Sequence, residues 1–301
     1  MQDYLSKPQE VFRQANVSTR KRNFKLWIAA QIFVRANPRK HAYLANYYLR
    51  WVDDKIDNPN ISIKEKEEFL SRQCVILECF TNNNLIELNN FEENYLFYLV
   101  KYSKDNDRTD IINLIKTNLD AFALDINRLK NGGSFTLNEL QLYLNLLLPP
   151  VYFLTMVFTL PKFKIKNKLF VGKFFYFVLS LRDFNEDLTA GYINVCKEDL
   201  LKYRINPNNI VEEPNLVEWA KDQYKEILKI LYEELDILHQ APLLIKMLWF
   251  PGFVDQYMDL LIIREKDFII TTETKIRYIS KIMIFIKAMI KGMKMFKKVF
   301  L

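Results

Sequence analysis

The segment YYLRWVDDKIDNP (residues 47–59) carries two aspartates, Asp53 and Asp57, that stand four residues apart. A second segment, FVLSLRDFNEDLTAGY (residues 177–192), contains another pair with the same spacing. In an α-helix, positions i and i+4 lie one turn apart on the same face. Each segment therefore predicts a helix that presents two carboxylates together.

Carboxylates in this arrangement suit Mg²⁺, which binds proteins through a few carboxylates together with phosphate oxygens and water. An acidic pair on a helix is more often simply a solvated face. Here, however, both pairs follow long apolar and aromatic runs, and an arginine stands just upstream of each, at Arg50 and Arg182. A charge near an apolar interior has to be paired or metal-bound. The two pairs therefore predict binding of Mg²⁺ and a diphosphate.

The chain has 301 residues, of which 50% are hydrophobic, with only 6 glycines and 10 prolines. This composition predicts helices with short connections around a large core. Apolar residues recur with helical spacing, and no convincing strand is visible. The expected helices lie near residues 8–34, 38–57, 63–81, 90–103, 109–130, 137–159, 167–189, 215–238, 242–263 and 273–299. We expect a single all-α domain over residues 1–301, a helical bundle with a central cavity.

Several other chemistries find no support in the sequence. The three cysteines lack zinc-ligand spacing, and two histidines argue against a Ser/His/Asp triad. No glycine-rich phosphate loop appears, so phosphate chemistry has to use metals and cationic side chains. The net charge of +7 suits anionic molecules or membranes, but no nucleic-acid-binding signature is present. Gly132-Gly133 predicts a turn between helices, with Ser134 and Thr136 as candidate caps of the next helix.

The N-terminus is polar, and no signal peptide is visible. The longest apolar stretches, around 144–160 and 169–181, are interrupted by Pro149-Pro150 or too short to span a bilayer. We therefore interpret them as buried core helices and expect a cytoplasmic location.

The C-terminal segment, residues 275–301, contains eight basic residues and no acidic one. On a helix, one face would carry Lys287, Lys291, Lys294 and Lys298, and the other Ile279, Met283, Ile286, Ile290 and Met293. A basic amphipathic helix is typical of peripheral contact with the inner face of a membrane. The alternative is a terminal helix that packs on the bundle and leaves its lysines in water.

The two aspartate segments resemble motifs of the squalene/phytoene synthase family. Residues 50–57 (RWVDDKID) resemble its first motif, an arginine followed by an aspartate-rich stretch. Residues 181–193 (LRDFNEDLTAGYI) resemble its second. By order and spacing the similarity extends over most of the chain, with weaker matches at Asp125 and Tyr257, but only the two aspartate segments are specific.

The resemblance implies an all-α isoprenoid synthase fold, three Mg²⁺ ions, ionisation of an allylic diphosphate and a carbocation guided along an apolar tunnel. It implies that the catalytic metal ligands are Asp53, Asp57, Asp183 and Asp187. Arg50 and Arg182 would contact the diphosphate, supported by Asp54 and Glu186. The other predicted substrate-binding residues are Tyr176, Phe177, Leu148, Tyr152 and Tyr257.

The chain departs from the family pattern where an isoprenoid chain would lie. Leu148, Pro149 and Tyr152 stand where the family has small residues, and Tyr176 and Leu179 replace the usual Gln and Asn before the second motif. Bulky side chains in this space would shorten, divert or close one arm of the cavity.

Three functions remain open on the sequence alone. The first is head-to-head condensation of prenyl diphosphates, of the farnesyl or geranylgeranyl class, to a squalene- or phytoene-like product. The second is a class I terpene cyclase acting on one prenyl diphosphate, which the altered small-residue segment favours. The third is a non-catalytic, membrane-associated family member, against which the four retained aspartates argue. Use of NADPH, product identity and oligomeric state are left open.

Overall fold

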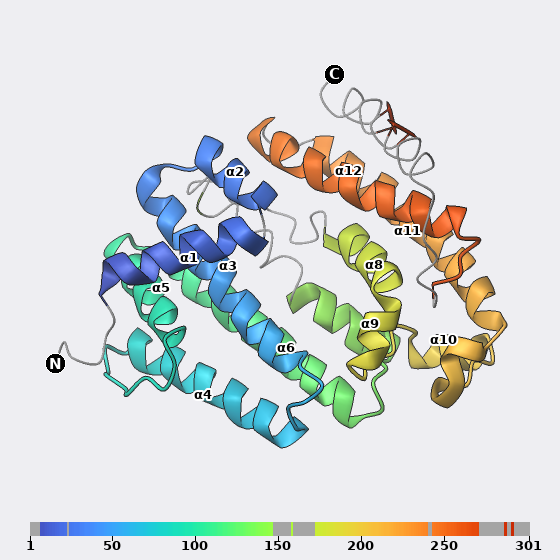
Figure 1. The fold of residues 1–301 in the computed structure, drawn as a ribbon, viewed down its shortest axis with the longest axis horizontal. Coiled ribbons are helices and arrows are strands. Elements are labelled where there is room, and N and C mark those ends of the chain that lie inside the picture. The colour runs from blue at the N-terminus through green and yellow to red at the C-terminus, as the bar shows by residue number, and fades with distance from the viewer. Residues whose placement is uncertain are drawn as a thin grey trace. The chain divides into compact units, whose positions relative to one another are not determined.

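The structure is a computed structural model of the chain, and it describes residues 7–22, 24–146, 158, 172–239, 243–270, 286–287 and 290–291. Within these ranges the regular structure consists of helices only (Figure 1). The chain divides into two compact units: residues 1–130 and 149–166 form the first, and residues 131–148 and 167–301 form the second. The helical architecture confirms the all-α class that the sequence predicts. The single-domain organisation stays a prediction.

The first unit is built around one long central helix, α3. Its described helices are α1 (Pro8–Arg22), α2 (Phe24–Phe33), α3 (Ala36–Ile56), α4 (Ile63–Thr81), α5 (Glu93–Asp105) and α6 (Thr109–Lys130). Helix α3 contacts all five of the others, as the blue and green part of Figure 1 shows. The aspartates at the C-terminal end of α3 are therefore held on the helix that packs against all the other described helices of this unit.

The sequence of α3 explains how it is oriented. Its buried residues are His41, Tyr43, Leu44, Ala45, Tyr48, Leu49, Val52 and Ile56. Most follow the three- and four-residue spacing of an apolar helix face. The buried Tyr48 hydroxyl donates to Gln73 Oε1 of α4 at 3.2 Å, and Gln73 Nε2 donates to Glu93 of α5 at 3.3 Å. This polar chain fixes the rotation of α3, so that Asp53 lies beside the apolar face, half-buried.

The second unit surrounds the helix that leads to the second aspartate pair. Besides a helix over residues 137–146, its described elements are α8 (Gly172–Arg182), α9 (Phe184–Thr189), α10 (Lys197–Lys202), the 3₁₀ helix η1 (Pro207–Glu212), α11 (Asn215–His239) and α12 (Leu243–Glu265). Helix α8 packs against both α11 and α12. Phe174 and Val178 of α8 are fully buried, which anchors the helix from its first turn.

Two expected helices are each divided in the structure. The helix expected near 8–34 is two helices, α1 and α2, which fold against each other: Trp27 Nε1 of α2 donates to Asn16 Oδ1 of α1 at 2.8 Å. The helix expected near 167–189 is broken at Asp183, whose backbone (φ −94°, ψ 11°) is not helical. The short elements α10 and η1 were not expected, because each is too brief to show a hydrophobic period.

The turn at Gly132-Gly133 is confirmed, and both glycines adopt positive φ, +89° and +80°. Thr136 caps the helix over residues 137–146: its hydroxyl accepts from the Glu139 amide at 3.2 Å, and the Glu139 carboxylate accepts from the Thr136 amide at 2.8 Å. The same role expected of Ser134 is wrong. Its hydroxyl donates to the Val195 carbonyl and so joins two loops of this unit.

Only a small part of the expected C-terminal helix lies among the described residues. Lys287 Nζ stands 3.6 Å from Glu265 Oε1, and Lys291 Nζ donates to the Tyr232 hydroxyl at 3.2 Å. Lys294 and Lys298 lie outside the described residues. The two contacts favour a terminal segment that packs on α11 and α12. Among the described helices, none is long and apolar enough to cross a bilayer.

Candidate active site

The first aspartate pair stands at the end of α3. The Asp57 amide donates to the Asp53 carbonyl at 2.9 Å, which closes the last helical turn and places both residues on one side of it. Arg50, one turn earlier, contacts Asp53 Oδ2 through Nη1 at 3.0 Å and Asp54 Oδ1 through Nε at 3.1 Å. The arginine and aspartates of the motif therefore form one charged cluster, as their spacing predicts.

Negative charge in this cluster exceeds what the arginine compensates. Burial, followed by the Asp57 carboxylate, raises the pKa of Asp53 to about 8, and Asp125 and Asp54 act in the same direction against Arg50. Asp125 belongs to α6 and is buried. A half-buried carboxylate among like charges is an environment that a divalent cation stabilises. The chemistry of these oxygen donors therefore fits Mg²⁺. In the described ranges, no three His, Cys, Asp or Glu side chains are grouped closely enough to form a metal site by themselves.

A hollow of about 510 Å³ adjoins this cluster within the first unit. Its walls are Ser18 and Arg22 of α1 together with Asn46, Tyr47 and Arg50 of α3. Arg22 pairs with Asp54, so the ion pair joins α1 to the aspartate motif. Both arginine side chains remain more than half exposed, which leaves N–H groups for an anion.

The second aspartate pair straddles the break between α8 and α9. The Asp187 amide still donates to the Asp183 carbonyl at 2.9 Å, so the two residues keep helical proximity across the break. Arg182 grips Asp183 with two hydrogen bonds, Nε to Oδ1 at 2.7 Å and Nη2 to Oδ2 at 2.6 Å. Its Nη1 donates to Asp259 of α12 at 3.2 Å. Asp187 accepts from the side-chain amide of Asn194.

A smaller pocket, of about 190 Å³, opens beside Arg182 and Asp183 within the second unit. Its polar lining comes from Arg182, Asp183, Asn185, Glu186, Asp259 and Lys266. Its apolar lining comes from Leu181, Ile262, Ile263, Ile269 and Ile270. A pocket with cationic and carboxylate groups at one side and aliphatic side chains at the other is suited to a polar head carrying an apolar chain.

The loop after the second pair is held by an unusually close backbone approach. The Ile193 amide donates to the Gly133 carbonyl at 2.7 Å, and the Lys197 amide donates to the Phe135 carbonyl at 2.9 Å. A Cβ added at Gly133 would lie 2.2 Å from the Gly191 carbonyl oxygen. Only glycine fits there, and the approach fixes the loop that carries Asn194 against Asp187.

The predicted substrate-binding aromatic residues form contacts within the second unit. Tyr176 meets Phe177 edge-on, with ring centroids 5.4 Å apart, and Tyr143 at 5.8 Å. Tyr257 of α12 is half-buried, and burial raises the pKa of its hydroxyl. Leu148, Pro149 and Tyr152, expected to narrow the cavity, lie outside the described residues.

The sequence does not predict three residues that contact the aspartate motifs, which are Arg22, Asp259 and Asn194. Each acts on an aspartate motif from a different helix or loop, and each has an ordinary sequence context. A signal existed only for Arg22, which ends a basic run at the end of α1.

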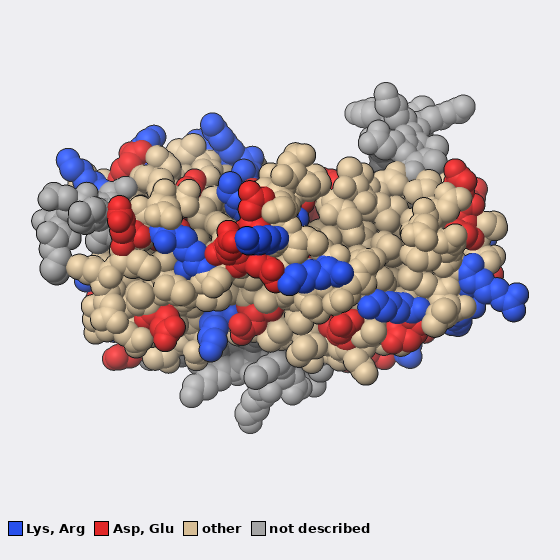
Figure 2. Space-filling view, turned by 90° about the horizontal axis from the view of Figure 1, so that it is seen from below, with Lys and Arg blue, Asp and Glu red and all other residues tan. Residues whose placement is uncertain are grey.

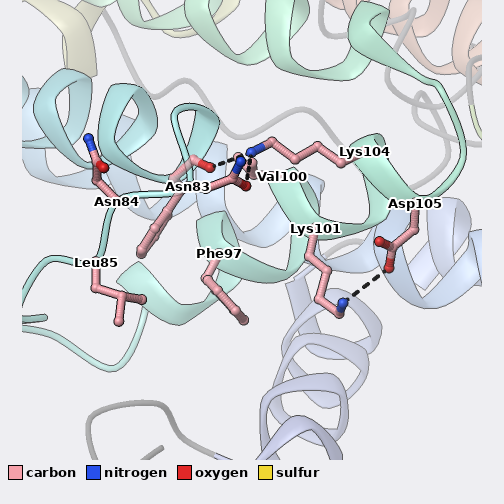
Figure 3. Close-up of a pocket in the computed structure, with 9 residues that line it drawn as sticks. Asn83, Asn84, Leu85, Phe97, Val100, Lys101, Lys104 and Asp105 are labelled. Carbon is pink, nitrogen blue, oxygen red and sulfur yellow. Dashed lines mark hydrogen bonds and ion pairs between the residues drawn. The ribbon is translucent and has the colours of Figure 1, made fainter. Parts of the chain in front are cut away.

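One further pocket, of about 230 Å³, lies between the end of α4 and α5 (Figure 3). There Lys104 Nζ donates to the Phe80 carbonyl at 2.9 Å and to Asn83 Oδ1 at 2.6 Å, while Lys101 pairs with Asp105 at 3.3 Å. Because these charged groups bind each other and the end of α4, we assign them a structural role.

The two aspartate pairs belong to different compact units, Asp53 and Asp57 to the first and Asp183 and Asp187 to the second. That the pairs act on one substrate stays a prediction from the sequence. Within each unit, however, the structure joins an aspartate pair to an arginine and to an adjoining pocket.

Comparison of the chain with known proteins gives its fold. No protein-family model and no curated protein matches it in sequence. Solved structures do match: a dehydrosqualene synthase in complex with a ligand has a TM-score of 0.64 at 15% identity, over 94% of this chain and 96% of that one. Squalene synthase HpnC from Alicyclobacillus acidocaldarius has a TM-score of 0.63 at 15% identity, over 87% and 97%. TcSQS in complex with a ligand has a TM-score of 0.67 at 14% identity, over 96% and 90%. The chain therefore has the all-α isoprenoid synthase fold of the squalene and dehydrosqualene synthases.

Proposed function

We propose that this protein is a Mg²⁺-dependent isoprenoid synthase that ionises allylic prenyl diphosphates and condenses two of them head to head. The observation that carries the proposal is the Arg50–Asp53–Asp57 cluster, where a carboxylate with its pKa raised to about 8 stands beside an exposed arginine and a hollow. The crowded carboxylates favour a bound cation, and the exposed arginine favours an anion, so the cluster suits a ligand that contains both.

Asp53 and Asp57 in the first unit, and Asp183 and Asp187 in the second, would each be ligands of Mg²⁺. Bound Mg²⁺ would supply neutralisation of the charge that develops on the departing diphosphate. Arg50 and Arg22 lie at the hollow beside the first pair and would bind diphosphate oxygens through their fork of N–H donors. Arg182 would do the same beside the second pair while its contact with Asp259 keeps it oriented.

The remaining work of the protein is to exclude water and to guide the cation. Tyr176 and Phe177, half-buried about two turns before Asp183, present aromatic faces that stabilise positive charge. The aliphatic lining from Ile262 and Ile263 offers a dry surface to the prenyl chain. Together these residues would shield the reactive cation until the second substrate captures it.

A terpene cyclase that acts on one prenyl diphosphate is the second candidate. The ring contact between Tyr143 and Tyr176 favours it, because two tyrosines fill space beside the second aspartate helix. Leu148 and Tyr152, which replace small residues of the family pattern, also favour the cyclase. Substituting Leu148→Ala together with Tyr152→Gly should then widen the range of products.

One experiment distinguishes the three candidate functions. The purified protein is incubated with farnesyl or geranylgeranyl diphosphate and Mg²⁺, with and without NADPH, while released diphosphate is measured and products are analysed by mass. A product with twice the carbon number of the substrate supports head-to-head condensation, and a product with the same carbon number supports the cyclase. Absence of diphosphate release with either substrate would leave the non-catalytic reading.

Site variants test the assignment of the aspartates. Asp53→Asn and Asp183→Asn should each lower diphosphate release by at least about 100-fold, the scale of losing one stabilising group in a transition state. The matched control is Asp110→Asn, because Asp110 in the first turn of α6 is an exposed aspartate, which pairs with Arg108 just before the helix. Full activity in either site variant would contradict the assignment.

A further inference from the structure

The first part of the chain has an unusual charge pattern. Between Val11 and Val52 there are nine basic residues and no acidic one. The basic residues are Arg13, Arg20, Lys21, Arg22, Lys25, Arg35, Arg39, Lys40 and Arg50. The nine positive charges of this stretch exceed the net charge of the whole chain, which is +7. The face seen in Figure 2, by contrast, carries acidic and basic side chains side by side.

Within this stretch, helix α2 exposes a large apolar surface. Phe24, Ile28 and Ile32 follow one another at intervals of four residues, and their side chains are 53%, 38% and 68% exposed. This spacing places them in one row, called here the outer stripe of α2. Three large apolar side chains in one row differ from the single exposed apolar residues that every surface carries.

The opposite side of α2 is already occupied. Ala30 of α2 and Val34, the residue after the helix, are buried, and α2 packs on α1 and α3. The Tyr43 hydroxyl of α3 donates to the Trp27 carbonyl at 3.3 Å, and Arg39 Nη1 donates to the Gln31 carbonyl at 3.1 Å. These contacts fix the rotation of α2, so the outer stripe is directed away from the core of this unit.

Basic side chains stand at both ends of the outer stripe. Arg20 and Lys21, at the end of α1, precede it and are exposed. Arg35 and Lys40 follow it and are exposed as well. The Arg20 guanidinium lies 5.3 Å from the centre of the Trp27 ring, which itself stacks on Phe24 at 5.8 Å. The arrangement is an aromatic and aliphatic row bordered by cations, with no carboxylate on α2 to repel an anionic surface.

We propose that the outer stripe of α2 docks this protein on an anionic lipid bilayer. Helix α2 would lie in the plane of the interface, with Phe24, Ile28 and Ile32 among the upper acyl chains and the flanking cations at the lipid phosphates. Charge complementarity is what selects a bilayer as the occupant, since the stretch of 42 residues that contains α2 carries positive charge alone. The proposal is separate from the C-terminal segment and does not rest on the proposed function.

Sedimentation of the full chain with vesicles tests the proposal in the absence of substrate. Vesicles of phosphatidylcholine with phosphatidylserine should bind the protein, and salt should weaken the binding. Ile28→Ser with Ile32→Ser should weaken it by at least about tenfold. Lys21→Gln with Arg35→Gln should weaken it about 25-fold, about fivefold for each charge near the surface.

Matched controls separate the outer stripe from general surface effects. Leu201→Ser removes an apolar side chain that is 80% exposed on α10, and Lys64→Gln removes an exposed cation on α4. Both control variants should bind vesicles like the original protein. Circular dichroism of each stripe variant establishes that its helices are retained.

A second measurement avoids substitution of the stripe. Brominated acyl chains should quench the tryptophan fluorescence of the bound protein, and Trp27→Phe should remove most of that quenching. The proposal is overturned if the protein ignores anionic vesicles, or if the stripe variants bind like the original protein. It is overturned as well if only Lys294→Gln with Lys298→Gln abolishes binding, which would place the contact in the C-terminal segment. A change from dimer to monomer in the stripe variants without lipid would instead identify the stripe as an interface between copies.

Discussion

Asp259 of α12 accepts a hydrogen bond from Arg182, the residue that holds both carboxylate oxygens of Asp183. Asp259 is largely buried, and burial raises its pKa although Arg182 opposes the shift. The pair links α12 to the second aspartate motif within one unit. Asp259 therefore positions the arginine that we propose to bind diphosphate.

We predict that Asp259→Asn lowers kcat/KM for diphosphate release by about 10- to 100-fold, as expected when the charged partner of a ligand-binding residue becomes neutral. The loss should appear mainly in KM, because Arg182 would remain but would be held by a weaker hydrogen bond to a neutral acceptor. Asp267→Asn is the matched control, since Asp267 is exposed and its positive φ of 50° is tolerated by asparagine. Kinetics of Asp259→Asn equal to those of the control would show that Arg182 does not need the negative charge of Asp259.

The metal assignment predicts a change in thermal stability that does not depend on turnover. Mg²⁺ with inorganic diphosphate should stabilise the original protein by about 2.7 kcal/mol at about 100 times the dissociation constant. Chelation should remove the effect. In Asp53→Asn the stabilisation should be much smaller, because a neutral amide replaces the carboxylate that would bind the cation. An equal upward shift of Tm in both proteins would place the metal elsewhere.

The sequence predicts the positions of most helices and the shared face of each aspartate pair, because both depend on local spacing. It does not predict that α1 and α2 are separate helices. The residues described as buried, which are Val11, Ala15 and Thr19 of α1, Ala30 of α2 and Val34 just after it, keep the helical phase from one helix to the next. A hydrophobic period therefore looks continuous although the two helices fold against each other.

The sequence does not predict the partners of the aspartate motifs, for a different reason. Asp259 lies 77 residues after Arg182, and Arg22 lies 32 residues before Asp54. Such pairings arise only when helices pack, and a single sequence carries no sign of them. The close approach of Gly133 to Gly191 is equally non-local, so that the glycine pair indicated a turn but not what the turn supports.

Glu234 of α11 gives a prediction about pH. It is buried, and its Oε1 accepts from the Lys173 and Phe174 amides at 3.1 and 3.3 Å, which caps the first turn of α8. Burial raises its pKa from 4.5 to about 8. The folded state therefore holds a proton that the unfolded state loses, so this group's contribution to stability is present below pH 4.5 and is lost as the pH rises towards 8.

We predict that Glu234→Gln flattens this decline, which amounts to at most about 1.4 kcal/mol per pH unit for one group. Thermal unfolding of the variant and the original protein across this pH range provides the measurement. The neighbouring Glu233 is exposed, so Glu233→Gln should keep the original pH dependence. Identical pH profiles for all three proteins would mean that Glu234 is ionised in the folded state.

The last prediction concerns the two glycines of the turn before residues 137–146. Gly132 and Gly133 have nearly the same positive φ, so alanine is strained at both. They differ in their surroundings: a Cβ at Gly132 meets nothing within 4 Å, whereas a Cβ at Gly133 meets the Gly191 carbonyl oxygen at 2.2 Å. Gly132→Ala is therefore the control that removes backbone strain from the comparison.

We expect Gly132→Ala to destabilise the protein by about 1 kcal/mol, the cost of a strained backbone conformation. Gly133→Ala should cost a further 1 to 3 kcal/mol (about the range for overpacking), because the loop that carries Ile193 and Asn194 has to move. The displacement would also withdraw Asn194 from Asp187, so activity should fall in Gly133→Ala and persist in Gly132→Ala. Equal stabilities by denaturant unfolding would show that the loop yields without cost. Equal activities would show that Asp187 does not need this support.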